Sequence, residues 1–171
     1  MLAVILASSC VADSAELSAT TQGDRTDRMM RPAIMASRFL GPWRIESSIA
    51  FDFAPSVRDP GINNYVEVVF SESPNSSALV ITHYLMEVPS WTTVISEGAT
   101  LRAITDGGLM RGEARSVMMD ERSIVMLSAV EGNWIVHSYR TVGDDVLEYC
   151  VLRLLEPMGG TPMMRRVYRR G

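Results

Sequence analysis

The chain has 171 residues, of which 47% are hydrophobic and 21% are charged, and its formal net charge is −4. This is enough apolar material for one folded domain and too little charge for a disordered chain. The negative charge argues against nucleic acid as a partner, since phosphate contacts need a surplus of positive charge. No apolar run reaches the roughly 18 residues of a membrane-spanning helix.

Cysteine and histidine, two residue types that often bind metals or take part in catalysis, are scarce. Two cysteines, Cys10 and Cys150, cannot form a disulfide framework or a metal cluster, and the two histidines, His83 and His137, cannot form a histidine-rich site. No dinucleotide-binding, P-loop, nucleophile-elbow or zinc-protease motif occurs. Candidate acids and bases such as Glu67 and His137 lie on separate predicted strands. We therefore expect no enzyme activity, no catalytic residue, no metal and no cofactor.

Residues 1–34 differ in character from the rest of the chain. A short apolar run, Leu2–Ala7, precedes a polar, aperiodic stretch, which indicates a flexible extension or an atypical targeting segment. The run lacks the basic start of a signal peptide. The small residues before Cys10 are loosely similar to a bacterial lipoprotein cleavage site, so a lipoprotein or secreted protein with a signal at residues 1–12 is the alternative. We favour Met35 as the natural start and a cytoplasmic location.

From Met35 onward, short runs rich in Val, Ile, Tyr, Trp and Thr alternate with turn residues, which predicts β-strands. The predicted strands are Phe39–Ser47, Tyr65–Ser71, Ala78–Val88, Trp91–Ser96, Thr100–Ile104, Leu109–Met119, Ser123–Val130, Trp134–Val142, Val146–Leu155 and Met163–Arg169. Tight turns join antiparallel neighbours, and closure into a barrel removes exposed edges. We expect residues 35–171 to form one all-β domain, an antiparallel meander barrel of about ten strands.

One connection, Ser48–Asn64, is long and contains Pro55 and Pro60, which disfavour a long helix. We expect an apolar loop, with at most a helical turn, over one mouth of the barrel.

The two ends of this domain resemble intracellular fatty-acid-binding proteins. Met35–Trp43 reads MASRFLGPW and resembles the opening of that family, and Gly143–Cys150 resembles its penultimate hairpin. Arg165–Arg169, RRVYR, is similar to its closing strand, in which an Arg-x-Tyr pair faces the interior. The Gly-x-Trp element, Gly41 to Trp43, is shared with lipocalins and other calycins. The resemblance implies a calycin barrel whose closed end is plugged by these two residues.

Strand geometry places Arg166, Tyr168 and Met164 on one face, because residues two apart point the same way. If that face points inward, the resemblance implies a lipophilic ligand whose carboxylate is bound by Arg166 and Tyr168 and whose body lies against Met164. Arg140 is a further candidate for this site. The alternative is a structural one, in which the arginines face solvent or Arg166 pairs with a carboxylate such as Glu148.

A second family competes for the same segment. Residues Ser138–Arg170 also resemble the end of nitrobindin-like heme barrels. That family has its proximal histidine after the Thr-Pro of the last hairpin, but here Thr161-Pro162 is followed by Met163-Met164. His137 is then the only nearby histidine that could bind iron.

Three functions follow as expectations. The first is non-enzymatic binding of a small lipophilic ligand with a carboxylate head inside the barrel. The second is a structural or protein-interaction domain whose barrel is filled by side chains, which would have a protein partner. The third is a nitrobindin-like heme barrel.

Overall fold

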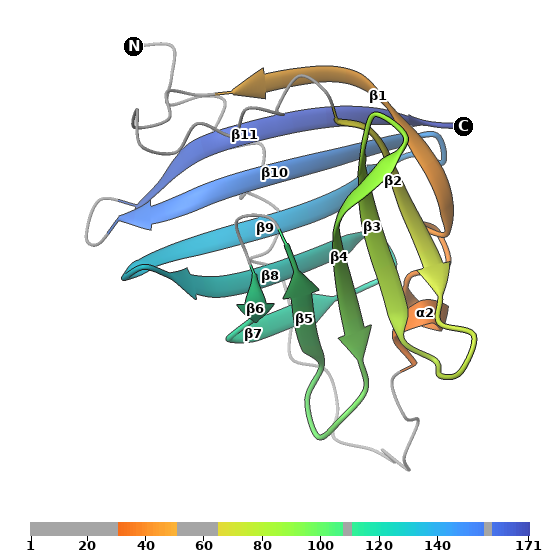
Figure 1. Ribbon diagram of the computed structural model, residues 1–171, viewed down its shortest axis with the longest axis horizontal. Coiled ribbons are helices and arrows are strands. Elements are labelled where there is room, and N and C mark those ends of the chain that lie inside the picture. The colour runs from red at the N-terminus through yellow and green to blue at the C-terminus, as the bar shows by residue number, and fades with distance from the viewer. Residues whose placement is uncertain (1–30, 51–64, 108–110, 156–158) are drawn as a thin grey trace, which may run out of the picture.

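The computed structural model describes residues 31–50, 65–107, 111–155 and 159–171, and within these ranges the fold is almost entirely strand (Figure 1). A short helix, α2 (Pro32–Met35), precedes the sheet. The described strands are β1 (Gly41–Ala50), β2 (Tyr65–Glu72), β3 (Leu79–Leu85), β4 (Val88–Ser96), β5 (Arg102–Asp106), β6 (Gly112–Glu113), β7 (Ser116–Met119), β8 (Ser123–Val130), β9 (Asn133–Val142), β10 (Val146–Leu155) and β11 (Gly159–Arg170). The predicted all-β antiparallel fold is confirmed.

The described strands form one sheet in the order β6-β5-β4-β3-β2-β1-β11-β10-β9-β8-β7. Strands that follow each other in sequence pair, except β6 and β7, which lie at opposite edges of the sheet. Strand β1 also pairs with β11, so the beginning and the end of the domain meet in the middle of the sheet. The sheet curls into a half-barrel, and Figure 1 shows β2–β5 running at a steep angle to β8–β11. The concave face of the curl therefore receives side chains from both halves.

The two edges of the sheet approach each other at one point, between β6 and β7. The backbone N–H of Ala114 donates to the carbonyl of Ala103 on β5 (2.9 Å), while the N–H of Arg115 donates to the carbonyl of Leu127 on β8 (2.7 Å). One short segment thus pairs first with one edge and then with the other, which draws the half-barrel toward closure.

Burial alternates along the strands, which explains why these sequences form a curled sheet. In β3, Leu79, Ile81 and His83 are buried while the residues between them are only partly covered. In β9, the buried positions run from Ile135 to Thr141 at every second residue. Successive strand side chains point to opposite faces, so the buried set lies on the concave face.

Two predicted strands need correction. The prediction Ala78–Val88 is wrong, because the chain turns at Met86, which adopts a positive φ of 58°, and the next strand begins at Val88. Methionine gives no turn signal, since positive φ is normally the property of glycine. The prediction Leu109–Met119 is also wrong as one strand: the described part of this segment forms β6 and β7, with a break where the chain changes edges. Ser123–Val130 and Val146–Leu155 match their predicted bounds.

The structure describes only part of two other predicted segments, the loop Ser48–Asn64 and the extension 1–34. Strand β1 continues to Ala50, so the first residues of the predicted loop Ser48–Asn64 are strand. Residues 51–64 lie outside the described residues, as does nearly all of the predicted extension 1–34. Helix α2 begins at Pro32, before the boundary predicted at Met35, and Ala33 is buried against the sheet.

The end of the half-barrel near α2 is formed by Phe39, Gly41, Trp43 and Arg170, which we call the closed end. Trp43 is completely buried, and its indole N–H donates to the carbonyl of Phe39 (2.6 Å). The Arg170 guanidinium lies 4.2 Å from the centre of the Trp43 ring and donates to the carbonyl of Leu40 (2.9 Å). Gly41 has a φ of 112°, which L side chains rarely adopt. The predicted plug residues therefore belong to a packed corner in which the first and last strands are joined.

No helix among the residues that the structure describes is long and apolar enough to cross a membrane.

Candidate functional site

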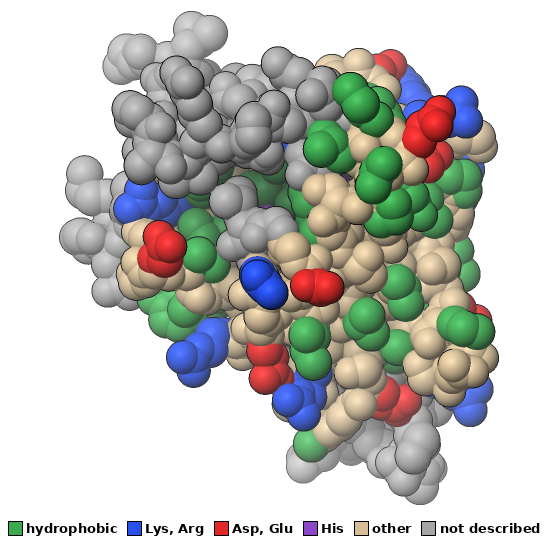
Figure 2. Space-filling model, in the orientation of Figure 1, with side chains coloured by type: hydrophobic (Ala, Val, Ile, Leu, Met, Phe, Trp, Pro, Cys, Tyr) green, Lys and Arg blue, Asp and Glu red, His purple; other side chains and the backbone are tan. Residues whose placement is uncertain are grey.

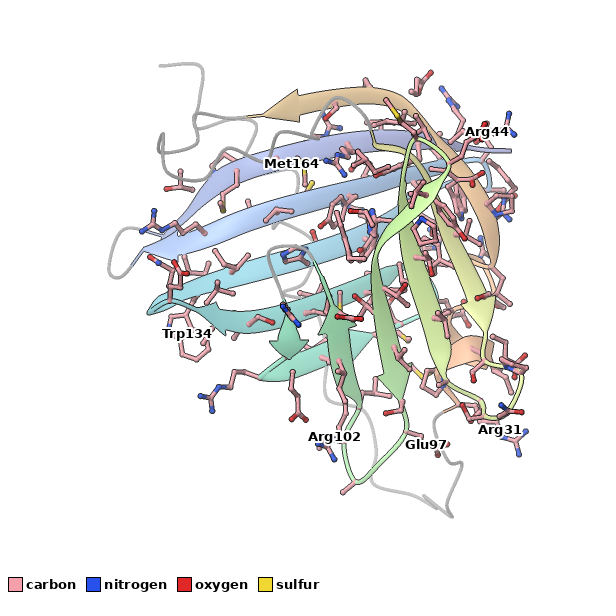
Figure 3. All side chains as sticks on the ribbon, in the orientation of Figure 1. Arg31, Arg44, Glu97, Arg102, Trp134 and Met164 are labelled. Carbon is pink, nitrogen blue, oxygen red and sulfur yellow. The ribbon has the colours of Figure 1, made fainter. Side chains whose placement is uncertain are left out.

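The last strand presents the predicted ligand-binding residues to the concave face. Arg166 and Tyr168 are 0% exposed and Met164 is 3% exposed, whereas Arg169 on the other face is exposed. Figure 3 shows Met164 on β11, within the curl of the sheet, while the labelled Arg102 points outward. The structure thus brings three of the four predicted ligand residues together on one inner wall.

Arg140 does not join them. It lies exposed on the outer face of β9, because the buried residues of this strand are at odd positions, including Tyr139 and Thr141 on either side. Glu148, the predicted alternative partner of Arg166, also lies away from the concave face and forms an ion pair with Arg165.

The centre of the concave face carries a group of polar and aromatic side chains that we call the polar layer: His83, His137, Tyr139, Tyr149 and Arg166. His83 Nε2 and the Tyr139 hydroxyl are 2.7 Å apart, and His137 Nδ1 and the Tyr149 hydroxyl are 2.6 Å apart. The two tyrosine rings stack with centroids 4.6 Å apart and an interplanar angle of 19°. All five side chains are buried.

The polar layer joins the two halves of the sheet. His83 comes from β3 and Tyr139 from β9, so their hydrogen bond crosses the interior. The Phe70 ring, from β2, meets Tyr139 edge-on at 5.4 Å, and Trp91, from β4, stacks on His83 at 4.0 Å. At this level the halves are in direct side-chain contact.

Both histidines are held neutral. Burial, and after it the positive charge of Arg166, lower the pKa of His137 to about 3. Burial, then Arg166 and then His137, keep the pKa of His83 well below its usual value. Burial likewise raises the pKa of Tyr139 well above its usual value, with Tyr149 acting in the same direction and Arg166 against it. The layer therefore contains neutral hydrogen-bonding rings around one guanidinium group.

Several buried polar atoms on the concave face have no hydrogen-bond partner among the described residues. They are Ser48 Oγ, Ser128 Oγ, Thr141 Oγ1 and His137 Nε2. By contrast, the hydroxyl groups of Thr93 and Thr105, which are also buried, bond to each other at 2.8 Å. Buried polar groups are nearly always paired, so atoms left open on an inner wall are candidates for contact with a bound molecule.

Ser48 belongs with Arg166. The two residues face each other across the β1–β11 pair, and directly opposed residues of antiparallel strands have their side chains on the same face. On the other side, Arg166 is opposed by Tyr149 of β10. The guanidinium is therefore flanked along its row by two hydroxyl-bearing side chains, and Tyr168 adds a third from the next row.

The part of the chain that the structure describes has no group of three or more His, Cys, Asp or Glu side chains arranged to hold a metal ion. Met164 and His137, the residues that bear on a heme interpretation, lie on the same wall, with Val151 of β10 between them in the pairing register.

Sequence reasoning named Arg166 as a ligand residue and raised His137 only as a possible heme ligand. It missed the other members of the polar layer and the serines. The signal for the histidines was available, because each continues a buried alternation in its own strand: Ile81 to His83 in β3, and Ile135 to His137 in β9. Ser48 gave no such signal, because a bulge between Ile45 and Ser47 shifts which residues of β1 face inward.

Comparison with known proteins gives no family for this chain: no protein-family model matches it, and the search of curated proteins returns no significant match.

Proposed function

We propose that this chain is a calycin-like barrel protein that binds, without catalysis, a small lipophilic molecule with a carboxylate head against the concave face. The observation that supports this most directly is Arg166. Among the described buried residues it is the only one with a permanent charge, and it lies at the centre of the inner wall.

The chemistry of Arg166 favours an oxyanion. A guanidinium cannot lose its proton, so in a dry interior its charge is best accommodated by an anion that accepts two parallel hydrogen bonds. The flanking hydroxyl groups of Ser48 and Tyr168 can donate further bonds to the same carboxylate. Because His83 and His137 stay neutral, the described residues of the interior offer one positive charge, which matches a ligand with a single acidic group.

The row beside this cation is apolar on three of its four strands. Met164, Val151 and Met126 occupy it on β11, β10 and β8, and His137 occupies it on β9. Ile135 lies in the following row of β9. Figure 2 shows hydrophobic side chains at depth on this face of the molecule. An apolar wall with a few convergent polar groups is typical of small-molecule sites, and methionine adapts readily to ligand shape.

The test is a binding titration with octadecanoic acid and its methyl ester, preceded by native mass spectrometry of the purified protein before and after organic extraction. We expect Arg166→Gln to weaken binding of the acid by roughly 10- to 100-fold, from the loss of charged hydrogen bonds, and to leave the ester unchanged. Arg140→Gln is the matched control, because this arginine is on the outer face. Equal losses for acid and ester, or none, would refute Arg166 as the anchor.

A filled barrel that acts as a protein-interaction domain is the second candidate. Two observations favour it: the direct hydrogen bond between His83 and Tyr139 across the interior, and an apolar pair on the outer face of β4 and β5. That pair is Val94 and Ile104, which are opposed in the sheet and are 38% and 53% exposed. A purified protein that carries no extractable molecule and binds neither acid nor ester would support this candidate and exclude the first.

A further inference from the structure

A second polar position lies on the inner wall, apart from Arg166. It consists of His137 Nε2 and Ser128 Oγ, both buried and both without a hydrogen-bond partner among the described residues. His137 is opposed by Met126 in the β8–β9 pair, and Ser128 is two residues further along the same face of β8. The two residues are thus diagonal neighbours, whose Cα atoms are about 7–8 Å apart. A side chain as long as histidine can span this distance.

The order of the strands in the sheet fixes the distance between His137 and Arg166. His137 is on β9 and Arg166 is on β11, with β10 between them, so their backbones are separated by two strand spacings, roughly 10 Å. Tyr149 of β10 lies between the two positions, since it is opposed to Arg166 and bonds to His137 Nδ1. Beside Tyr149, in the row of His137, Val151 and Met164 are apolar. A molecule bound to Arg166 by its carboxylate would pass along this apolar pair before it reached His137 Nε2.

The hydrogen bond on the other side of the ring defines what His137 can bind. Its Nδ1 is engaged with the Tyr149 hydroxyl, so only Nε2 is open to the interior. If Nδ1 carries the proton, Nε2 is an acceptor; if the tyrosine donates, Nε2 is a donor. A hydroxyl group satisfies either tautomer and can also exchange a hydrogen bond with Ser128, whereas a carbonyl oxygen satisfies only one.

We propose that the natural ligand is a hydroxylated carboxylate: its acid group binds Arg166, and a hydroxyl further along its chain binds His137 Nε2 and Ser128 Oγ. This inference rests on the proposed function, because it assumes a carboxylate at Arg166. It adds the chemical group by which the protein selects among such ligands.

The experiment is a titration of the full chain with octadecanoic acid and with hydroxyoctadecanoic acids in which the hydroxyl is placed at successive carbons. We expect one position of the hydroxyl to increase affinity about tenfold over the parent acid, the gain from hydrogen bonds to two otherwise unpaired groups. Hydroxyls nearer the carboxylate than the favoured position should weaken binding, since they would place a polar group against Val151 and Met164.

Variants of His137 and Ser128 test whether the preference for a hydroxy acid depends on these two residues. The preference is the ratio of the affinities for the favoured hydroxy acid and for the parent acid. Ser128→Ala should reduce this ratio about threefold, and His137→Phe should abolish the preference. Thr141→Val is the matched control: Thr141 is also buried without a partner among the described residues, but it is on the far side of Tyr139 on β9, and its loss should leave the preference intact. If His137→Phe does not fold, the smaller Ser128→Ala still decides.

The two proposals fail differently. If no carboxylate binds in a manner that depends on Arg166, both are wrong. If the parent acid binds through Arg166 but no hydroxyl position improves affinity, or if Thr141→Val removes the preference as fully as His137→Phe, only the hydroxyl site is overturned.

Discussion

The closed end and the polar layer both place polar groups in the core of the half-barrel, but they satisfy those groups in different ways. At the closed end, the Trp43 indole has a carbonyl partner, and Arg170 donates to the carbonyls of Arg38, Leu40 and Asp144 while its guanidinium covers the Trp43 ring. In the polar layer, His137 keeps one ring nitrogen without a partner among the described residues.

This difference indicates that the closed end contributes mainly to stability and the polar layer mainly to binding. Pairing within the closed end joins the first strand, the last strand and the segment before them, and its hydrogen bonds need no other molecule. The polar layer leaves His137 Nε2 and nearby hydroxyl groups without a partner among the described residues, and a buried polar group without a hydrogen bond costs free energy. Proteins commonly tolerate such costs at sites where a ligand binds. We therefore expect changes at the closed end to affect unfolding, and changes in the polar layer to affect pH dependence and binding.

The largest effect expected is that of Trp43→Ala. Removing a completely buried indole leaves a cavity and should lower the free energy of unfolding by about 3–5 kcal/mol. Urea denaturation followed by circular dichroism measures it. Trp134→Ala is the matched control, because Trp134 is exposed at the start of β9 and should cost less than about 1 kcal/mol. Similar losses for the two variants would show that the closed end is not a principal source of stability.

The second prediction concerns acid. His137 has a pKa of about 3 in the folded protein and about 6.5 when unfolded, so below pH 6.5 the unfolded state binds the proton that the folded state excludes. Stability is therefore full above pH 6.5 and declines as the pH falls. Between pH 7 and pH 5 the loss from His137 alone should be about 2 kcal/mol, and His83 acts in the same direction.

Denaturation at a series of pH values from 7.5 to 5 tests this, a range chosen to stay above the titration of most carboxyl groups. His137→Phe should make the decline clearly shallower. Trp43→Ala should lower stability by a similar amount at every pH, because the closed end contains no group that titrates in this range. An unchanged slope in His137→Phe would mean that His137 is not excluded from protonation in the folded state.

Much of the fold follows from local pattern, but the site does so only in part. Alternation of apolar residues gives strands such as β8 and β10 directly, and the two-residue period places Arg166, Tyr168 and Met164 on one face. The turn at Met86 could not be predicted, since its positive φ is imposed by pairing of β3 with β4 rather than by a glycine.

The polar layer depends on contacts between distant parts of the chain. His83 and Tyr139 are 56 residues apart in sequence, and only the curl of the sheet brings β3 over β9. A local pattern shows that both residues face inward but not that they face each other. The inward position of Ser48 depends similarly on the bulge in β1, which pattern alone does not reveal.

The smallest effect predicted is that of Arg170→Gln. The variant loses the contact between the guanidinium and the Trp43 ring and the hydrogen bonds to three backbone carbonyls, but the position is exposed and water replaces part of this pairing. We expect a loss of about 1–2 kcal/mol in the free energy of unfolding, with the pH dependence of the unchanged protein. Arg102→Gln, which removes an exposed ion pair to Glu113 on β6, should cost less than about 0.5 kcal/mol. If the two arginine variants lose equal stability, Arg170 acts as an ordinary surface charge, and the contrast between a fully paired closed end and a partly open polar layer loses its energetic basis.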